Sequence, residues 1–171
     1  LQRFGDEIGW PIVAKASRGG YDGHGVWKLA GPQDCNQPFD ESKDASAGEL
    51  VEIIGEEFID FARELSVLVV RSASGQAVCY PVTETVQREG VCRETITPAP
   101  GLAPARAAEI SRLGLDIADE LQVVGVLAVE LMQRRDGSVV INELAMRPHN
   151  TGHWTIDGAH TSQFENHLRA V

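Results

Sequence analysis

A run of side chains that could do chemistry follows the last apolar stretch of the chain. It reads Asn142-Glu143-Leu144-Ala145-Met146-Arg147-Pro148-His149-Asn150 and continues through Thr151 and Gly152 to His153 and Trp154. Carboxylate, guanidinium, imidazole and amide groups together can bind a metal ion, hold an anion and move a proton. Polar groups at this density are costly as plain structure, so we expect a functional site here.

A hairpin should position the acids of this run. Two apolar runs, 125–133 and 138–145, flank Asp136-Gly137, which predicts a two-residue turn. If Arg135 pairs with Ser138, Glu130 lies directly opposite Glu143. Two carboxylates about 5 Å apart repel by roughly 3 kcal/mol at an effective dielectric of about 20. The same face is expected to carry Val126, Ala128, Met132, Ile141 and Ala145.

That face is too apolar for a solvated surface, so we expect a divalent cation as the counter-ion of the acids. Mg²⁺ fits best, because it prefers oxygen ligands and is commonly held by one or two carboxylates together with substrate phosphates. In the alternative, one glutamate lies at an exposed edge or pairs with an arginine. For an isolated acid pair this alternative is the better one, but a second motif changes the balance.

The second motif is a glycine-rich loop after a short strand. The apolar run 11–16 contains Lys15 and leads into residues 17–25, which hold Gly19, Gly20, Gly23 and Gly25. Glycines let backbone amides approach a polyphosphate, and a lysine adds charge beside it. No Lys-Ser or Lys-Thr follows, and 26–29 reads as a strand, which predicts a hairpin flap in place of a P-loop. In the alternative, the loop is an ordinary turn and the lysine reaches to water.

Composition limits the classes of function. The chain has 171 residues, 43% hydrophobic and 23% charged, which suits one globular domain or two small lobes. A net charge of -10 and a pI near 4.9 argue against a broad nucleic-acid or membrane surface and favour small-molecule partners. Three cysteines without Cys-x-x-Cys spacing indicate neither a disulfide framework nor a zinc knuckle, and predict a reducing cytoplasm. No long apolar run indicates a membrane span.

The remaining elements follow from periodicity. The end of a helix is expected at 2–9, a polar connection at 31–44, and an ordered segment at 50–59. Strands of an antiparallel meander are expected at 64–71, 76–81 and 91–97, and a helix at 104–121 that covers one face of the sheet. A last helix at 162–170 should begin at Ser162 and turn Phe164 and Leu168 to the core, while His160 and His167 face solvent. His149 and His153 are not expected to form a zinc pair, and His153 and Trp154 are expected to pack or to anchor the loop.

These pieces together resemble the ATP-grasp superfamily. The segments 19–23, 142–154, 161–165 and 167–170 are similar, within it, to the N5-carboxyaminoimidazole ribonucleotide synthase family, over nearly the whole chain. The resemblance implies an α+β fold in which two lobes, with mainly antiparallel sheets and helices packed on them, clasp ATP. Residues 1–55 would form the small lobe with its glycine-rich flap, and 56–171 the large lobe.

The resemblance also implies an activity. The enzyme would be a cytoplasmic ligase that uses ATP and Mg²⁺ to activate bicarbonate as carboxyphosphate. The carboxyl group would then pass to the exocyclic amine of 5-aminoimidazole ribonucleotide, with release of ADP and phosphate. A homodimer is one expectation for the full-length enzyme.

Each candidate residue takes a role from the same resemblance. The implied ATP-binding residues are Lys15, Gly20, Tyr21, Asp22, Gly23, His24 and Gly25 at the phosphates, Glu56, Glu57, Phe58 and Ile59 at adenine, Glu64 at the ribose, and Asn142 and Glu143 at the phosphates. The implied magnesium ligands are Glu130 and Glu143. Arg147, His149 and Asn150 are the implied catalytic set that holds bicarbonate and then carboxyphosphate, since a guanidinium fits a planar carboxylate and an imidazole can donate or move a proton. Tyr21 and Asp22, with Arg147 and His149, would contact the ribonucleotide.

Some positions depart from the family pattern. His24 stands where arginine is usual and Val26 where glutamine is usual, which predicts a weaker or pH-dependent phosphate contact; Thr151 replaces a common serine. The amino-terminal nucleotide-fold domain and the carboxy-terminal domain of the family are not in this chain, so we expect the ATP-grasp core of a longer enzyme, poorly active alone. The rival interpretations are another ATP-grasp ligase, such as a formate-using transformylase or a biotin carboxylase, and a non-catalytic nucleotide-binding fragment.

Overall fold

The chain is built around two antiparallel sheets, each in its own unit. The computed structural model describes residues 1–18, 23–45 and 52–171. One unit comprises Leu1–Ile59 with Glu89–Val91, and the other comprises Asp60–Arg88 with Cys92–Val171. Helices accompany both sheets, which confirms the predicted α+β class. No helix in the described part of the chain has the length and apolarity needed to cross a membrane.

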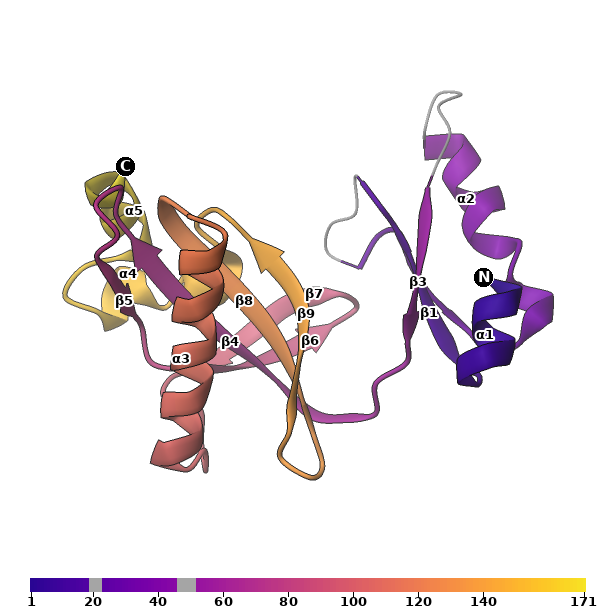
Figure 1. Ribbon diagram of the computed structural model, residues 1–171, viewed down its shortest axis with the longest axis horizontal. Helices are drawn as coiled ribbons and strands as arrows, with labels where there is room; N and C mark the ends of the chain where they lie inside the picture. Colours follow the sequence, from indigo (N-terminus) through magenta and orange to yellow (C-terminus); the bar gives the residue numbers. More distant parts are fainter. Residues whose placement is uncertain (19–22, 46–51) are drawn as a thin grey trace. The chain divides into compact units, whose positions relative to one another are not determined.

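The first unit contains a three-stranded sheet with helices on one face (Figure 1). Its elements are α1 (Gln2–Ile8), β1 (Ile12–Ala16), β2 (Val26–Leu29), η1 (Pro32–Asp34), α2 (Gln37–Ala45) and β3 (Ile53–Glu57). The strand order is β2-β1-β3, so β1 is central. Ile12, Ala14 and Leu29 are fully buried, and Phe4 of α1 packs against them. The residues that alternate with these, Lys15 among them, lie on the opposite face.

The helix α2 was not predicted, because segment 31–44 was expected to be an irregular connection. The carboxylate of Asp34 accepts hydrogen bonds from the amides of Ala30 and Gly31 at 2.8 and 3.2 Å, which orders the chain before the helix. Pro38 then occupies the first turn of α2, where its missing N–H costs no helical bond. Asp34 and Pro38 are thus two signals for the start of a helix, but the segment has almost no apolar periodicity.

The second unit contains six strands. They are β4 (Phe61–Arg71), β5 (Ala77–Cys79), β6 (Thr83–Arg88), β7 (Val91–Ile96), β8 (Gly125–Arg134) and β9 (Val139–Ala145). The order is β7-β6-β4-β8-β9, with β5 pairing β4 beside β6. Strand β6 was not predicted, and the sheet is not a simple meander, because the long strand β4 pairs with β5 along one half and with β6 along the other.

Helix α3 (Pro104–Glu120) covers one face of this sheet, as predicted (Figure 1). Leu65, Val67, Leu127 and Val129 of the sheet pack against buried Ile110 of the helix. Pro104 is the first helical residue, where its fixed φ favours helix initiation.

The other face of the sheet is covered along only part of its strands. There Leu68, Val70, Val126 and Ala128 form a smaller buried cluster with Ala170. Ala170 belongs to α5 (Gln163–Ala170), which follows the short helices η2 (Asn150–Gly152) and α4 (Thr155–Gly158). The same face continues toward Ser66 and Glu64 along β4 and toward Glu130 along β8.

Helix α5 begins where the sequence predicted but faces the other way. The hydroxyl of Ser162 accepts a hydrogen bond from the amide of Glu165 at 3.2 Å, which confirms the predicted N-cap. Phe164 and Leu168 are 41% and 74% exposed, so their predicted core position is wrong. Gln163 and Ala170 are buried instead.

The predicted exposure of His167 is also wrong. This residue is half-buried, and its Nδ1 accepts a hydrogen bond from the amide of Val126, at the start of β8, at 3.1 Å. His160 is exposed, as predicted.

Candidate functional site

The turn between β8 and β9 has three residues, so the predicted two-residue turn is wrong. The amide of Arg134 donates to the carbonyl of Ser138 at 2.9 Å, and the amide of Gly137 donates to the carbonyl of Arg134 at 3.0 Å. Gly137 has a φ of 84°, the left-handed conformation that three-residue hairpin loops need at this position. Gln133 consequently pairs with Val139, one residue away from the predicted register.

A β-bulge in β9 then restores the predicted pair of acids. The register shifts between Leu131 and Glu130, and Asn142 is the extra residue on the bulged strand. Beyond the bulge, Glu130 pairs directly with Glu143. The juxtaposition of the two glutamates is therefore confirmed, although the chain reaches it by a different route.

The bulge has a physical reason in the sequence. Continued without a bulge from the three-residue tip, the ladder would pair Asn142 with Glu130 and Glu143 with Val129, which is fully buried in the core beneath α3. A carboxylate on that apolar side would lose its hydration, which is costly. With the bulge, Ile141 stays opposite Leu131 and Glu143 pairs with Glu130 on the other face. The predicted position of Ile141 beside the acids is therefore wrong, and Val140 pairs with Met132 there instead.

The acid pair lies on the part of the sheet face that α5 does not cover. Ser66 of β4 pairs with Glu130, and Glu64 lies two residues away on the same strand and face. Burial raises the pKa of the Glu64 carboxyl above its usual value. The pKa of the Cys92 thiol on β7 is raised first by burial and then by the negative charges of Glu130 and Glu64. These groups therefore share one partly desolvated, electronegative region.

His149 joins this region from the loop after β9. Its ring is buried, and its Nε2 lies 3.5 Å from Oε1 of Glu130. Its Nδ1 lies 3.0 Å from the hydroxyl of Thr151, and that hydroxyl lies 2.9 Å from the hydroxyl of Ser66. The structure thus connects the acid pair to β4 through an imidazole and two hydroxyl groups. Ser66 had not been predicted as a site residue, although a lone serine inside the apolar run 65–70 is a signal.

The backbone of His149 is held by a side chain from α5. The Oε1 of Gln163 accepts from the amide of His149 at 2.9 Å, and its Nε2 donates to the carbonyl of His149 at 2.6 Å. Gln163 is fully buried, and a Cβ on Gly152 would lie 2.6 Å from its Oε1. Close packing thus requires glycine at 152. No role had been predicted for Gln163, although it lies in segment 161–165 of the family resemblance.

Arg147 and Asn150 flank His149 with different surroundings. Arg147 is exposed, and its Nη1 donates to the carbonyl of Pro148 at 3.0 Å. The Oδ1 of Asn150 is buried and has no hydrogen-bond partner among the residues that the structure describes. An orphaned buried acceptor is uncommon in folded proteins, so this amide is a candidate for contact with a ligand.

In the first unit, the predicted phosphate-binding residues divide between described and undescribed parts. The Nζ of Lys15 lies 2.7 Å from Oε2 of Glu56, and both lie on the sheet face opposite α1. The amide of Ala16 donates to the carbonyl of Gly25 at 2.8 Å, which closes the predicted hairpin. Gly23 and Gly25 have φ values of 78° and 76°, conformations in which glycine is favoured. Gly20, Tyr21 and Asp22 lie outside the described residues, whereas exposed His24 lies within them.

The predicted adenine segment follows β3. This strand ends at Glu57, which pairs with Ile12, so Phe58 and Ile59 lie beyond the sheet ladder. The Nζ of Lys28 lies 3.9 Å from the centre of the Phe58 ring. This cation-π contact holds the Phe58 ring beside the Lys28 side chain of β2.

The donor atoms of the acid pair suit a hard cation. The described residues contain no group of three or more His, Cys, Asp or Glu side chains placed to bind a metal alone. Glu130 and Glu143, with the amide of Asn142, offer oxygen ligands only, a set that fits Mg²⁺ completed by phosphate and water. The set does not fit structural zinc, which takes four protein ligands rich in nitrogen and sulfur.

The rings of His149 and His153 have different surroundings. The His149 ring is buried beside Glu130, whereas exposed His153 stacks on Phe164 with ring centres 6.0 Å apart. Trp154 packs edge-on against Tyr80 at 5.9 Å, so its predicted packing role is confirmed.

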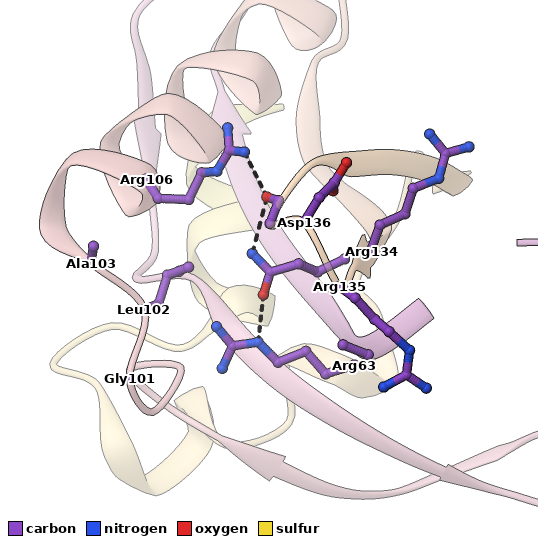
Figure 2. A pocket seen from close by; sticks show the side chains of 11 residues that line it. Arg63, Gly101, Leu102, Ala103, Arg106, Arg134, Arg135 and Asp136 are labelled. Carbon is purple, nitrogen blue, oxygen red and sulfur yellow. Dashed lines mark hydrogen bonds between the residues drawn. The ribbon is translucent and has the colours of Figure 1, made fainter. Parts of the chain in front are cut away.

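A cavity of about 420 Å³ lies elsewhere in the second unit, at the tip of the β8–β9 hairpin. Four arginines line it, but their guanidinium groups do not converge on a common point (Figure 2). Arg63 donates to Gln133 at 2.7 Å, and Arg106 donates to the carbonyl of Gly137 at 2.6 Å. Figure 2 shows the side chains of Arg134 and Arg135 directed outward. Arg63 and Arg106 therefore hold the hairpin tip through hydrogen bonds, and the arginines of this cavity do not form an anion site.

Comparison with known proteins gives consistent results. A family model described as an ATP-grasp domain matches residues 1–164. The N5-carboxyaminoimidazole ribonucleotide synthase of Mycobacterium bovis is 54% identical over 168 residues, which cover 98% of this chain and 38% of the relative. The chain therefore spans well under half the length of this curated relative.

Solved structures agree with the sequence relatives. The N5-carboxyaminoimidazole ribonucleotide synthetase of Thermus thermophilus has a TM-score of 0.83 at 36% identity, over 100% of this chain and 44% of that one. The Aspergillus clavatus synthase, solved in complex with ADP and 5-aminoimidazole ribonucleotide, has a TM-score of 0.82 at 29% identity, over 99% of this chain and 42% of that one.

Proposed function

The chain belongs to the ATP-grasp family, and on that premise we propose that it is the ATP-grasp core of an N5-carboxyaminoimidazole ribonucleotide synthase. The reaction carboxylates 5-aminoimidazole ribonucleotide with bicarbonate, at the expense of ATP, through carboxyphosphate. The observation that carries this proposal is the acid pair Glu130 and Glu143, held opposite each other on an open sheet face beside the Arg147–Asn150 segment.

In the second unit, Glu130 and Glu143 are the proposed ligands of Mg²⁺, and Asn142 contacts the same phosphates. When bound, the ion would neutralise charge on the phosphate oxygens during transfer. The bulge at Asn142 supports this assignment, since bulges beside active sites re-aim a side chain and interrupt regular pairing. Glu64 is proposed to bind the ribose hydroxyls.

Arg147 and Asn150 are the proposed holders of bicarbonate and then of carboxyphosphate. Exposure leaves the Arg147 fork accessible, and two parallel N–H groups match a planar carboxylate. The unpartnered buried Oδ1 of Asn150 supports a ligand contact by that amide. His149 belongs to the same set and lies beside Glu130.

In the first unit, Lys15 and the loop that includes Gly20, Gly23, His24 and Gly25 are proposed to contact the ATP phosphates. The ion pair of Lys15 with Glu56 places the ammonium group on the open sheet face. The backbone of segment 56–59 is proposed to bind adenine, because β3 ends at Glu57 and the groups beyond it lie outside the ladder. Tyr21 and Asp22 are proposed to contact the ribonucleotide.

The test is made on the natural polypeptide that contains this chain. ADP release is measured with ATP, Mg²⁺, 5-aminoimidazole ribonucleotide and either bicarbonate or formate. We expect release with bicarbonate and none above background with formate. Dependence on formate would assign the chain to a different ATP-grasp ligase and refute the proposal.

Variants then connect the activity to the acid pair. Glu130→Gln and Glu143→Gln remove charge but keep shape, and we expect each to lose at least 100-fold in kcat while circular dichroism stays unchanged. Glu120→Gln, at the exposed end of α3, is the matched control and should retain activity. Unchanged activity in both acid variants would exclude their role as metal ligands.

Two broader expectations belong to the same proposal. A cytoplasmic location fits a biosynthetic ligase acting on small metabolites, and a homodimer is proposed for the full-length enzyme. Fractionation and light scattering of the natural polypeptide would check them.

A further inference from the structure

The ring of His149 is held by protein atoms at both of its nitrogens. Nδ1 lies 3.0 Å from the hydroxyl of Thr151, and Nε2 lies 3.5 Å from Oε1 of Glu130, which is ion-pair distance and longer than an ordinary N–H···O hydrogen bond. The ring is only 7% exposed. Water therefore competes little for either nitrogen, and the neighbouring groups decide which one carries the proton.

A backbone amide fixes the direction of these hydrogen bonds. The amide of Thr151 donates toward Nδ1 of His149 at 3.5 Å, and an amide N–H can only donate. Nδ1 is therefore an acceptor, and in the neutral ring the proton is on Nε2, facing Glu130. The Thr151 hydroxyl then donates to Nδ1 and accepts from the hydroxyl of Ser66, which lies 2.9 Å away. In the opposite arrangement the lone pair of Nε2 would face a carboxylate oxygen.

The backbone of the same residue is held independently of the ring. Gln163 pairs with both the amide and the carbonyl of His149, at 2.9 and 2.6 Å. The amide of Gln163 is bonded in turn to the hydroxyl of Thr155 at 2.9 Å. The ring therefore projects from a fixed point, and Thr151 determines only its tautomer and rotation.

We propose that Thr151, supported by Ser66, is a positioning residue that holds His149 as the Nε2–H tautomer, so that this N–H orients the carboxylate of Glu130. The proposal rests on the proposed role of Glu130 as a metal ligand. A carboxylate fixed through one oxygen presents the other in a defined direction, and such outer contacts change metal affinity or activity by about 10- to 100-fold.

The tautomer is tested first, without metal or substrate. The natural polypeptide is labelled with nitrogen-15 in its histidines, and its spectrum is recorded at about pH 8, where an ordinary histidine is neutral. The His149 signals are assigned by their loss in His149→Gln. We expect a protonated Nε2 and an unprotonated Nδ1. A protonated Nδ1 in the parent protein would overturn the proposal.

Variants test the part played by the hydroxyl. Thr151→Val keeps the long amide contact at 3.5 Å but loses the hydroxyl 3.0 Å from Nδ1, so the Nδ1 signal should shift to that of a more weakly hydrogen-bonded acceptor. Thr151→Ser should restore the parent spectrum, and Ser66→Ala should give a smaller shift than Thr151→Val. Thr83→Val is the matched control, because Thr83 is also fully buried but pairs with Thr97 at 2.7 Å. If Thr151→Val does not fold, Ser66→Ala decides. A parent-like spectrum in every folded variant would overturn the proposal.

The consequence for Glu130 is measured by calorimetry of Mg²⁺ binding in the presence of ADP. We expect Thr151→Val to weaken Mg²⁺ binding about 10-fold or more, and Thr151→Ser to bind like the parent. Equal binding by the parent and Thr151→Val would overturn the link to Glu130. A parent protein with the expected tautomer and Mg²⁺ affinity but no bicarbonate-dependent ADP release would refute the proposed function and leave this inference standing.

Discussion

The two hydrogen bonds between Gln163 and the backbone of His149 permit a quantitative prediction for Gln163→Leu. Leucine has a similar size, but it can neither accept from the His149 amide nor donate to its carbonyl. Each buried backbone group left without a partner costs about 1–3 kcal/mol, which gives about 2–6 kcal/mol for the pair. The more apolar side chain returns about 1 kcal/mol. The expected loss in the free energy of unfolding is therefore about 1–5 kcal/mol.

The measurement uses urea unfolding followed by tryptophan fluorescence. The chain has three tryptophans, of which only Trp154 belongs to the second unit. Replacing Trp10 and Trp27 by phenylalanine in the parent and in the variant makes the signal report on that unit. Gln76→Leu, at an exposed loop position, is the control and should change stability by no more than about 0.5 kcal/mol.

A second measurement separates loss of the clamp from general loosening. The His149 amide should exchange with solvent faster in Gln163→Leu, whereas the amides of α3, which packs on the opposite face of the sheet from α5, should change only with global stability. If Gln163→Leu unfolds at the same urea concentration as Gln76→Leu, the two hydrogen bonds do not hold the loop and the reasoning is wrong.

Two further predictions concern the same unit. Arg106→Ala should destabilise the second unit by about 1 kcal/mol in urea unfolding, because a charged donor to the Gly137 carbonyl is lost. Arg112→Ala is the control: it loses only an exposed pair with Asp116 on the same helix and should cost less than about 0.5 kcal/mol. Glu64→Gln should be more stable than the parent near pH 7 and equal to it near pH 4. The reason is that burial raises the pKa of the Glu64 carboxyl, so this group contributes stability at low pH that is lost as pH rises through that pKa. A variant less stable than the parent at neutral pH would contradict this.

Sequence patterns predicted elements best where several signals agreed. Periodicity and Pro104 together predicted α3 to within one residue, and the short, mostly apolar run 26–29 predicted the boundaries of β2. Helix α2 escaped because its sequence is nearly all polar, and β6 because its alternation of threonines with polar residues resembles a loop. In both cases tertiary contacts stabilise an element whose own residues give a weak signal.

The site was predictable in its residue types but not in its supports. The acids and His149 were recognisable because they are polar groups next to apolar runs, where they are costly unless they serve a site. Gln163 and Ser66 did not, because their roles depend on which backbone and hydroxyl groups the fold brings near them. The N-cap Ser162 located α5 correctly, but it carries no information about which side turns inward, and the buried side includes a glutamine in place of the expected phenylalanine.

The irregular ladder of the β8–β9 hairpin has a consequence for engineering and for divergence among homologues. Twelve residues separate Glu130 from Glu143, an even number that a flat ribbon with a two-residue tip could also close. The chain places its surplus residue at position 142 and compensates at the tip. Substitutions that removed the bulge and shortened the tip to two residues would pair residue 142 with Leu131, on the face of the sheet that α3 covers. Glu130 would still lie opposite Glu143. The identity and direction of the group beside the acids can thus vary independently of the acids themselves.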